Sequence, residues 1–186
     1  MAPGLPAGLL AHTDRMVALA DRLAARHGLD RGRVRLAAQG HDLLRAVPPH
    51  ELLARATARR LAIDPVERGE PVLLHGPLGA LELSERFRVT DEGVLAAVRW
   101  HTTGHPDFAA EQWAVFVADK AEPDKVARRP ALAKVAMLAE RSLDAAALVY
   151  LDLLLEQAVE ERWALHPLAK LARNALLARG AGRLEG

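Results

Sequence analysis

The sequence contains an adjacent imidazole and carboxylate, His41-Asp42, in a largely apolar segment. Four more polar residues interrupt apolar helical stretches elsewhere: His12, His75, His101 and Asp119. An unpaired polar group on such a face costs about 1–3 kcal/mol. Shared metal coordination explains all of these interruptions at once, because imidazole nitrogen and carboxylate oxygen are both metal ligands. The pattern therefore predicts a metal site assembled from several segments.

The alternative to metal binding is that His41-Asp42 has only a structural role. Asp42 would then point to solvent, and His41 would be a partly buried residue satisfied by one hydrogen bond. An isolated His-Asp pair favours that explanation. The order of the other three histidines and Asp119 along the chain is what favours metal binding.

The elements that position these residues are all predicted to be helices. Apolar residues recur at helical spacing almost from end to end, whereas β-branched and aromatic residues are too sparse for strands. We therefore predict an all-α fold, with a single domain over residues 1–186 and a frayed tail over 180–186. The predicted helices cover about 10–26, 30–47, 49–60, 73–83, 90–101, 113–121, 129–140, 142–163 and 166–180.

The second predicted helix carries the His-Asp pair. Asp30 is expected to cap it, its apolar face extends to Leu44, and Pro48 ends it. His41 and Asp42 are therefore expected near the middle of a helix.

The boundaries of two later helices also concern the site. Thr90 is predicted to cap the helix that ends at His101, and a loop follows over residues 102–106. The helix that carries Asp119 is predicted to end before Glu122-Pro123.

Composition excludes several kinds of protein. With 25 basic and 24 acidic residues the net charge is +1, which gives no electrostatic footprint for duplex nucleic acid or an anionic membrane. The absence of cysteine excludes disulfides, iron–sulfur clusters, thiolate zinc sites and a catalytic thiol. A content of 51% hydrophobic residues excludes intrinsic disorder.

The sequence gives no targeting signal. Its first six residues, Met-Ala-Pro-Gly-Leu-Pro, lack the basic region and apolar core of a signal peptide. The longest apolar stretch, residues 145–155, contains Asp152 and is far shorter than the ~20 residues that span a bilayer. We therefore predict a cytoplasmic protein.

The order His … His-Asp … His … His … Asp resembles the pattern of HD-domain metal phosphohydrolases. Within them the chain looks most like the bacterial symmetrical bis(5'-nucleosyl)-tetraphosphatases of the YqeK type, over about residues 9–178. His-Thr-Thr-Gly followed by Ala-Asp-Lys-x-Glu-Pro is more specific than His-Asp alone. The resembling segments are AHTDRMVALADRLAARHGLD, GHDLLRAVPPHELL, LLHGPLGA, VRWHTTGHP, FVADKAEP and HPLAKLARNALL.

This resemblance implies a helical bundle that holds two metal ions, with iron expected and Mn, Co or Ni also suited to the ligands. It assigns His12, His41, Asp42 and Asp119 to one ion. Asp42 is the bridge, and together with His75 and His101 it is assigned to the other ion. A carboxylate can bridge because it offers one oxygen to each ion. The implied reaction is symmetrical cleavage of diadenosine tetraphosphate to two ADP, by metal-activated water attacking a central phosphate.

Two residues depart from the pattern of that family. Arg45 stands where relatives usually have Lys. An arginine guanidinium can donate two parallel hydrogen bonds to a phosphate, whereas a lysine ammonium group acts as a single point charge. Gly40 stands where relatives favour a bulky aliphatic residue. Its effect is either looser packing or close approach of another backbone.

Further residues are predicted to act on the substrate. Asp42, Arg45 and Lys120 are assigned to catalysis, although Lys120 could equally be a solvated lysine at a helix end. The predicted substrate contacts are Arg45, Thr102, Thr103, Gly104 and His105. For the two threonines the alternative is ordinary turn chemistry. Trp100, Trp113 and Phe116 are interpreted as core residues rather than adenine platforms.

Two other functions remain open from the sequence. A nucleotidase or phosphodiesterase acting on a smaller nucleotide would share every ligand. A non-catalytic nucleotide-sensing module usually lacks a ligand, and none is missing here. The expected partner is a dinucleoside polyphosphate, without nucleic acid or membrane. The sequence leaves a homodimer open.

Overall fold

The computed structural model describes residues 6–182, and within this range it contains helices and no strand. The all-α prediction is confirmed. None of the helices in this range is long and apolar enough to cross a membrane. The α-helices are α1 (Ala7–Arg26), α2 (Arg31–Gly40), α3 (Pro49–Ala58), α4 (Pro65–Gly69), α5 (His75–Phe87), α6 (Glu92–Arg99), α7 (Ala110–Ala121), α8 (Pro123–Arg128), α9 (Ala133–Ala139), α10 (Leu143–Glu161) and α11 (Pro167–Ala178). Short 3₁₀ helices cover Pro71–Leu74 and Pro130–Leu132.

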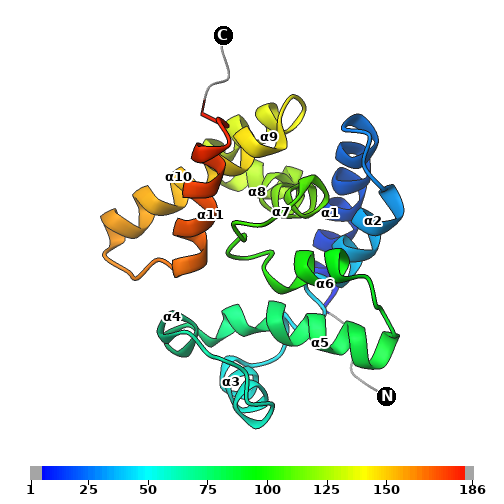
Figure 1. Ribbon diagram of the computed structural model, residues 1–186, viewed down its shortest axis with the longest axis vertical. Coiled ribbons are helices and arrows are strands. Elements are labelled where there is room, and N and C mark those ends of the chain that lie inside the picture. Colours follow the sequence, from blue (N-terminus) through cyan, green and yellow to red (C-terminus); the bar gives the residue numbers. More distant parts are fainter. Residues whose placement is uncertain (1–5, 183–186) are drawn as a thin grey trace.

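Helix α7 forms the centre of the fold. Every residue from Gln112 to Ala121 is buried, because this helix is apolar on nearly all sides. It packs against α1, α2, α6, α9 and α10, which surround it in Figure 1. A polar side chain on α7, such as Asp119, is therefore placed inside the bundle.

A smaller group of helices lies at one end of the molecule. Helices α3, α4 and α5 lie together below α6 in Figure 1, and α10 and α11 pack against each other to the left of α7. Leu52, Ala56, Leu74 and Leu78 form a second, small apolar cluster between α3, α5 and the 3₁₀ helix before α5. This packing positions the beginning of α5, which starts at His75.

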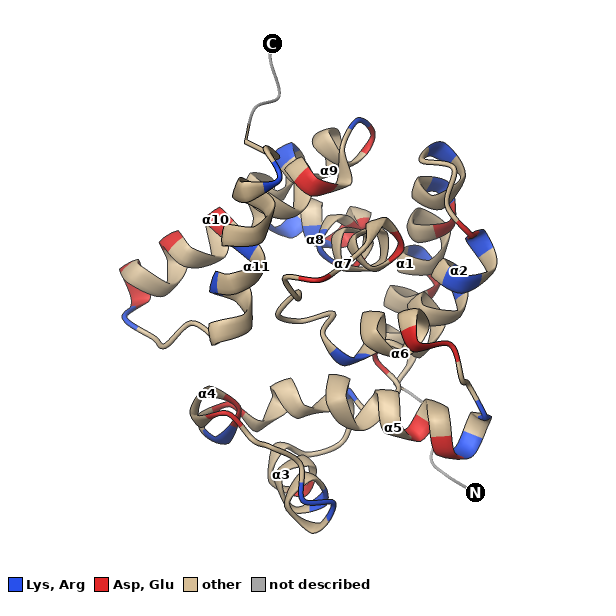
Figure 2. Cartoon of the chain, viewed as in Figure 1, with Lys and Arg blue, Asp and Glu red and all other residues tan. Residues whose placement is uncertain are grey.

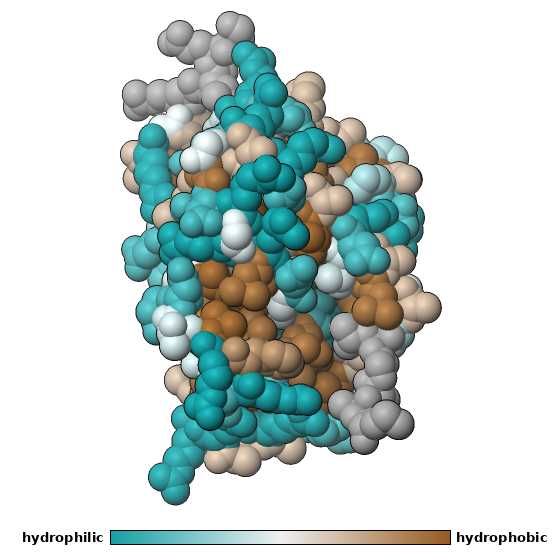
Figure 3. All heavy atoms as spheres, turned by 90° about the vertical axis from the view of Figure 1, so that its right-hand side faces the viewer, coloured by the Kyte–Doolittle hydropathy of each residue, from teal (hydrophilic) through white to brown (hydrophobic). Residues whose placement is uncertain are grey.

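The surface carries both signs of charge and some exposed apolar residues. Basic and acidic residues occur together on most helices (Figure 2). Exposed large apolar side chains include Leu10, Leu36 and Phe87, on α1, α2 and α5. Apolar residues also gather in the middle of the face seen in Figure 3. Such exposure is ordinary, since about 55–60% of a folded protein's surface is apolar.

The predicted position of His41-Asp42 within a helix is wrong. Helix α2 ends at Gly40, and residues 41–46 form turns. The backbone at His41 itself nevertheless keeps helical dihedral angles, with φ −58° and ψ −39°. The close approach at Gly40 comes from the side chain of Leu83, whose Cδ1 would lie 2.6 Å from an added Cβ.

Several predicted boundaries also differ. Asp91 rather than Thr90 caps α6, since its carboxylate accepts a hydrogen bond from the Val94 amide at 3.0 Å. Short helices, α4 and α8, form where loops were predicted. Pro65 and Pro123 occupy the first turns of these helices, where a missing N–H costs nothing. Residues 73–74 belong to a 3₁₀ helix rather than to α5.

The tail predicted to fray over 180–186 is only partly described. Helix α11 ends at Ala178 and turns follow to residue 182. The remaining positions, 183–186, lie outside the described residues, as do residues 1–5.

Candidate metal centre

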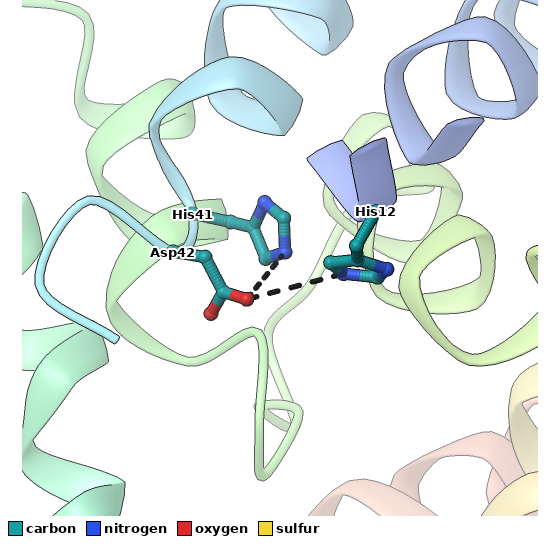
Figure 4. A group of neighbouring side chains, drawn as sticks. All are labelled: His12, His41 and Asp42. Carbon is teal, nitrogen blue, oxygen red and sulfur yellow. Dashed lines mark ion pairs between the residues drawn. The ribbon is translucent and has the colours of Figure 1, made fainter. Parts of the chain in front are cut away.

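The structure brings all six predicted ligands into one buried cluster. His12 lies within α1, His41 and Asp42 follow α2, and His75 is the first residue of α5. His101 follows α6 by two residues, and Asp119 lies within α7. Five separate segments therefore meet at this point. Figure 4 shows His12, His41 and Asp42 converging from two of them.

The carboxylate of Asp42 lies between two pairs of histidines. Its Oδ1 atom is 3.0 Å from Nε2 of His75 and 3.6 Å from Nε2 of His101. Its Oδ2 atom is 3.4 Å from Nε2 of His41 and 3.9 Å from Nε2 of His12, as the dashed lines in Figure 4 mark. Each oxygen thus serves one side of the cluster, which is the arrangement a bridging carboxylate requires.

Asp119 closes the side formed by His12 and His41. Its Oδ1 atom is 3.2 Å from Nε2 of His12 and 3.7 Å from Nε2 of His41. Lys120 and Lys125 both donate to this carboxylate. Burial alone would raise the pKa of Asp119, but the two ammonium groups and the nearby imidazoles hold it well below its ordinary value.

Three of the histidines are oriented by carbonyl groups of their own segments. Nδ1 of His41 lies 2.7 Å from the Ala38 carbonyl, and Nδ1 of His101 lies 2.8 Å from the Val98 carbonyl. Nδ1 of His75 contacts the carbonyl oxygen of Val72. The acceptors of His41 and His101 lie in the last turns of α2 and α6, where carbonyl groups lack intrahelical partners. A proton on each Nδ1 leaves the Nε2 lone pair facing the cluster.

The two histidines on the Oδ1 side of Asp42 lie very close together. Their Nε2 atoms are 2.9 Å apart. Close packing between α5 and α6 sets this distance, because a Cβ on Gly76 would lie 2.7 Å from the Arg99 carbonyl oxygen. With both protons on Nδ1, two nitrogen lone pairs and one carboxylate oxygen converge without a donor. A cation satisfies such a group of acceptors.

Burial keeps the imidazoles of His41 and His101 in the form that binds metal. It lowers the pKa of His41 and lowers the pKa of His101 to about 4, so both rings are neutral at pH 7. Burial alone would raise the pKa of Asp42, but the imidazoles of His101, His75 and His41 hold it below its ordinary value. Neutral imidazole and ionised carboxylate are the states in which these side chains coordinate metal.

Unsatisfied atoms also fit a metal site. Nε2 of His12 and Nε2 of His41 are buried and have no hydrogen-bond partner among residues 6–182. Both atoms face the carboxylates of Asp42 and Asp119. Ligand atoms from the six residues form three overlapping groups, each within 4.8 Å. Nitrogen and oxygen donors of this kind suit Fe, Mn, Co, Ni or Zn.

The HD domain family profile matches residues 9–124, which is more than half of the chain. This chain belongs to the HD domain family. The matched range contains all six cluster residues and ends soon after Asp119. The predicted resemblance to this family is therefore confirmed.

Two relatives and one solved structure are similar to the chain. It is 31% identical to "Bis(5'-nucleosyl)-tetraphosphatase, symmetrical" of Bacillus subtilis, over 73% of this chain and 71% of that protein. It is 33% identical to the protein of the same name from Halalkalibacterium halodurans, with the same coverage. A crystal structure from Clostridium acetobutylicum, described as a predicted HD superfamily hydrolase involved in NAD metabolism, superposes with a TM-score of 0.88. That comparison has 25% identity and covers 94% of this chain and 92% of the other.

A cavity of about 320 Å³ adjoins the HD domain cluster. Lys120 lines it and also donates to the carbonyl oxygen of His101 at 2.8 Å, which connects the cavity to the candidate ligands. Thr102 and Thr103 line the same cavity. The remaining wall includes Tyr150, Leu154, Trp163 and Leu165 from α10 and the segment that follows it. The space therefore has a polar end beside the cluster and an apolar, aromatic side.

The structure separates the predicted substrate residues of this HD domain into three environments. Lys120 is buried, with its ammonium group 4.9 Å from the centre of the Phe116 ring, so the solvated alternative is wrong. Arg45 is exposed, three residues after Asp42. His105 stacks on Trp100, with ring centres 4.1 Å apart, and does not line the 320 Å³ cavity.

The loop after His101 is shaped partly by turn chemistry. Gly104 has φ +70°, a conformation that favours glycine, and an added Cβ would lie 3.3 Å from the Trp113 ring. The Thr103 hydroxyl donates to the Gly104 carbonyl at 2.9 Å. The core assignment of Trp113 and Phe116 is confirmed, whereas Trp100 is only half-buried.

Sequence reasoning did not assign Glu122 or the residues of the cavity wall. Glu122 is fully buried and its Oε1 atom lies 3.5 Å from Nδ1 of His12. Its place in the Ala-Asp-Lys-x-Glu-Pro motif was the available signal. Tyr150 and Trp163 carry no such signal, because aromatic residues at helical spacing are typical of any core.

Proposed function

We propose that this chain is a metal-dependent hydrolase that cleaves diadenosine tetraphosphate symmetrically into two ADP. The observation that carries this proposal is the position of Asp42, with one carboxylate oxygen toward His75 and His101 and the other toward His41 and His12. The names of the relatives from B. subtilis and H. halodurans support the choice of substrate.

The ligands divide into two sets in this proposal. One ion is held by His12, His41, Asp42 and Asp119, and the second by Asp42, His75 and His101. Iron is the proposed metal, with Mn, Co and Ni as alternatives that the same donors suit. Two metal ions at such a site lower the pKa of a water molecule and offset the charge of the phosphate that it attacks.

The remaining residues bind and orient the substrate. Lys120 lies at the polar end of the 320 Å³ cavity, where its ammonium group can contact a phosphate oxygen beside the ligands. The hydroxyl of Thr102 and the amide groups of residues 102–104 are further donors there. Arg45 approaches the phosphate chain from solvent in this arrangement.

The wall of the cavity suits one nucleoside. The aromatic rings of Tyr150 and Trp163 and the side chains of Leu154 and Leu165 offer an apolar surface for a base. Water then attacks a central phosphorus atom, the P–O bond to the bridging oxygen breaks, and each product carries two phosphates. We propose that ligands and wall belong to one domain that spans residues 1–186.

The test is product analysis with the metal-loaded protein. Chromatography at early times should give ADP as the sole product of diadenosine tetraphosphate, and prior chelation should abolish the reaction. Early ATP and AMP in equal amounts would mean asymmetric cleavage and would contradict the proposal. Faster hydrolysis of AMP or ADP than of the dinucleotide would favour a nucleotidase instead.

A further inference from the structure

His12 differs from the other three histidines of the cluster in how its ring is held. His41, His75 and His101 each have Nδ1 beside the carbonyl group three residues earlier. His12 lies within α1, where the preceding carbonyl groups already accept hydrogen bonds of the helix. Its ring therefore needs an acceptor from another part of the chain. The nearest is Oε1 of Glu122, 3.5 Å from Nδ1.

Glu122 is fixed in place by its other oxygen. Oε2 accepts hydrogen bonds from Nε of Arg15 at 2.8 Å and from the Asp124 amide at 3.1 Å. Arg15 lies three residues after His12, so the histidine and the cation that holds its carboxylate partner share one face of α1. The guanidinium also pairs with Asp124 at 2.8 Å.

The free oxygen of Glu122 has one evident donor. Its side chain is fully buried, and Oε1 has no hydrogen-bond partner within the described part of the chain. A buried carboxylate oxygen is costly unless a donor reaches it. Nδ1 of His12, 3.5 Å from Oε1, is positioned to supply that donor. With the proton on Nδ1, the Nε2 lone pair faces Asp119, 3.2 Å from its Oδ1.

We infer that Glu122, held by Arg15, is a positioning residue that fixes the tautomer and rotation of His12. This inference rests on the proposed metal centre. Glu122 touches neither ion in this scheme. It acts through His12 on the ion shared with His41 and Asp119, and partners of this kind typically change metal affinity by 10–100-fold.

Glu122→Gln is the decisive variant because it preserves size and removes one acceptor. Arg15 and the Asp124 amide are both donors, so the amide oxygen of Gln stays with them and its NH₂ group faces His12. Nδ1 of His12 must then accept, and the ring proton moves to Nε2, where it blocks coordination. The hydrogen-bond partners of the side chain are retained although the charge that pairs with Arg15 is lost, and we expect the variant to fold.

Two measurements test the inference. In metal-free protein, nitrogen-15 NMR of the imidazoles should give His12 protonated on Nδ1 in the wild type and on Nε2 in Glu122→Gln. Titration of the metal-free proteins with Mn²⁺ should give about 10–100-fold weaker affinity for one ion in the variant. Asp124→Asn is the matched control, since Asp124 contacts Arg15 but not His12. It should change neither measurement.

The outcomes are distinct. An Nδ1-protonated His12 in Glu122→Gln, with both affinities unchanged, overturns the inference. An Nε2-protonated His12 in the wild type overturns it as well, even if the variant fails to fold. The tautomer is measured without metal, so failure of the proposed function, seen as no hydrolysis of diadenosine tetraphosphate by the wild type, is a separate result.

Discussion

The first two thirds of the chain and the last third contribute different things to the same site. Residues 7–121, from α1 to α7, provide every candidate ligand found among the described residues. The part after Glu122 provides none of them, yet Tyr150, Leu154, Trp163 and Leu165 form one side of the adjoining cavity. The HD domain match ends at residue 124, close to this boundary. The candidate ligands thus all lie in the first two thirds of the chain, whereas both parts of the chain line the adjoining cavity.

Buried polar residues follow the same division. Nine of the ten buried polar or charged residues lie at or before Glu122, and His166 is the one after it in the described range. The last third is otherwise built on buried Ala and Leu, as in α10. A region that holds ions needs many mutually dependent polar contacts, whereas a wall for a base needs only shape and apolar surface. Substitutions in the two regions should therefore have different consequences.

Asp42→Ala should have the largest effect. It removes the ligand that both halves of the centre share, so metal content should fall from about two ions per chain toward zero. Activity should fall at least ~10³-fold, because metal activation of water is worth several kcal/mol. Elemental analysis and steady-state kinetics measure both. Asp14→Ala, at an exposed position of α1, is the control. Retention of metal and rate in Asp42→Ala would make the His-Asp pair structural.

Arg45→Ala tests an exposed residue of the ligand-bearing region that is not itself a ligand. Metal content should stay near that of the wild type, while kcat/KM falls about 10–100-fold with the loss of one charge-assisted contact. Arg45→Lys should recover part of the loss. Arg35→Ala, at an exposed position of α2, should leave kinetics unchanged. A rate equal to the wild type in Arg45→Ala would remove Arg45 from the site.

Trp163→Ala tests the cavity wall. Loss of one base-stacking surface is worth about 1–3 kcal/mol, so KM should rise about tenfold while kcat and metal content change little. Leu171→Ala, an exposed apolar residue of α11, is the matched control. If Trp163→Ala released metal, the two regions would be coupled and the division between them would fail.

Acidification should destabilise the ligand-bearing region of the metal-free protein. His101 has a pKa of about 4 in the folded state, against about 6.5 in the unfolded chain. Between these values the unfolded chain binds more protons, so the free energy of unfolding falls as the pH falls. From pH 7 to pH 5, His101 alone should remove roughly 2 kcal/mol. Urea denaturation of metal-free protein at both pH values measures this. Equal stability at both would contradict neutral burial of His101.

The ligands could be predicted from the sequence because each one interrupts an apolar pattern. His12, His75, His101 and Asp119 stand out in this way, and all of them reach the cluster. The local structure at His41-Asp42 could not be predicted, because α2 ends where Leu83 packs against Gly40, a contact between residues 43 positions apart. Apolar periodicity continues past that point and gives no sign of the turn.

The cavity wall could not be predicted for a different reason. Tyr150 lies on α10, whose apolar residues are not confined to one face, and Trp163 lies just beyond its end. The packing of α10 against α7 and α11 decides what they face. Glu122 could be predicted from the sequence only in part. Its motif was visible, but its contact with His12 joins residues 110 positions apart.

The contact at Gly76 bears on how this protein can diverge in sequence. The start of α5 meets the end of α6 through main-chain atoms, with the Arg99 and Val98 carbonyl groups occupying the space of a side chain. The separation of His75 and His101 is consequently set by backbone, which substitutions at surrounding core positions do not alter. We therefore expect exchanges among Leu, Val and Ala around α5 and α6 to leave the spacing of the two imidazoles unchanged. Gly76 itself has no such freedom.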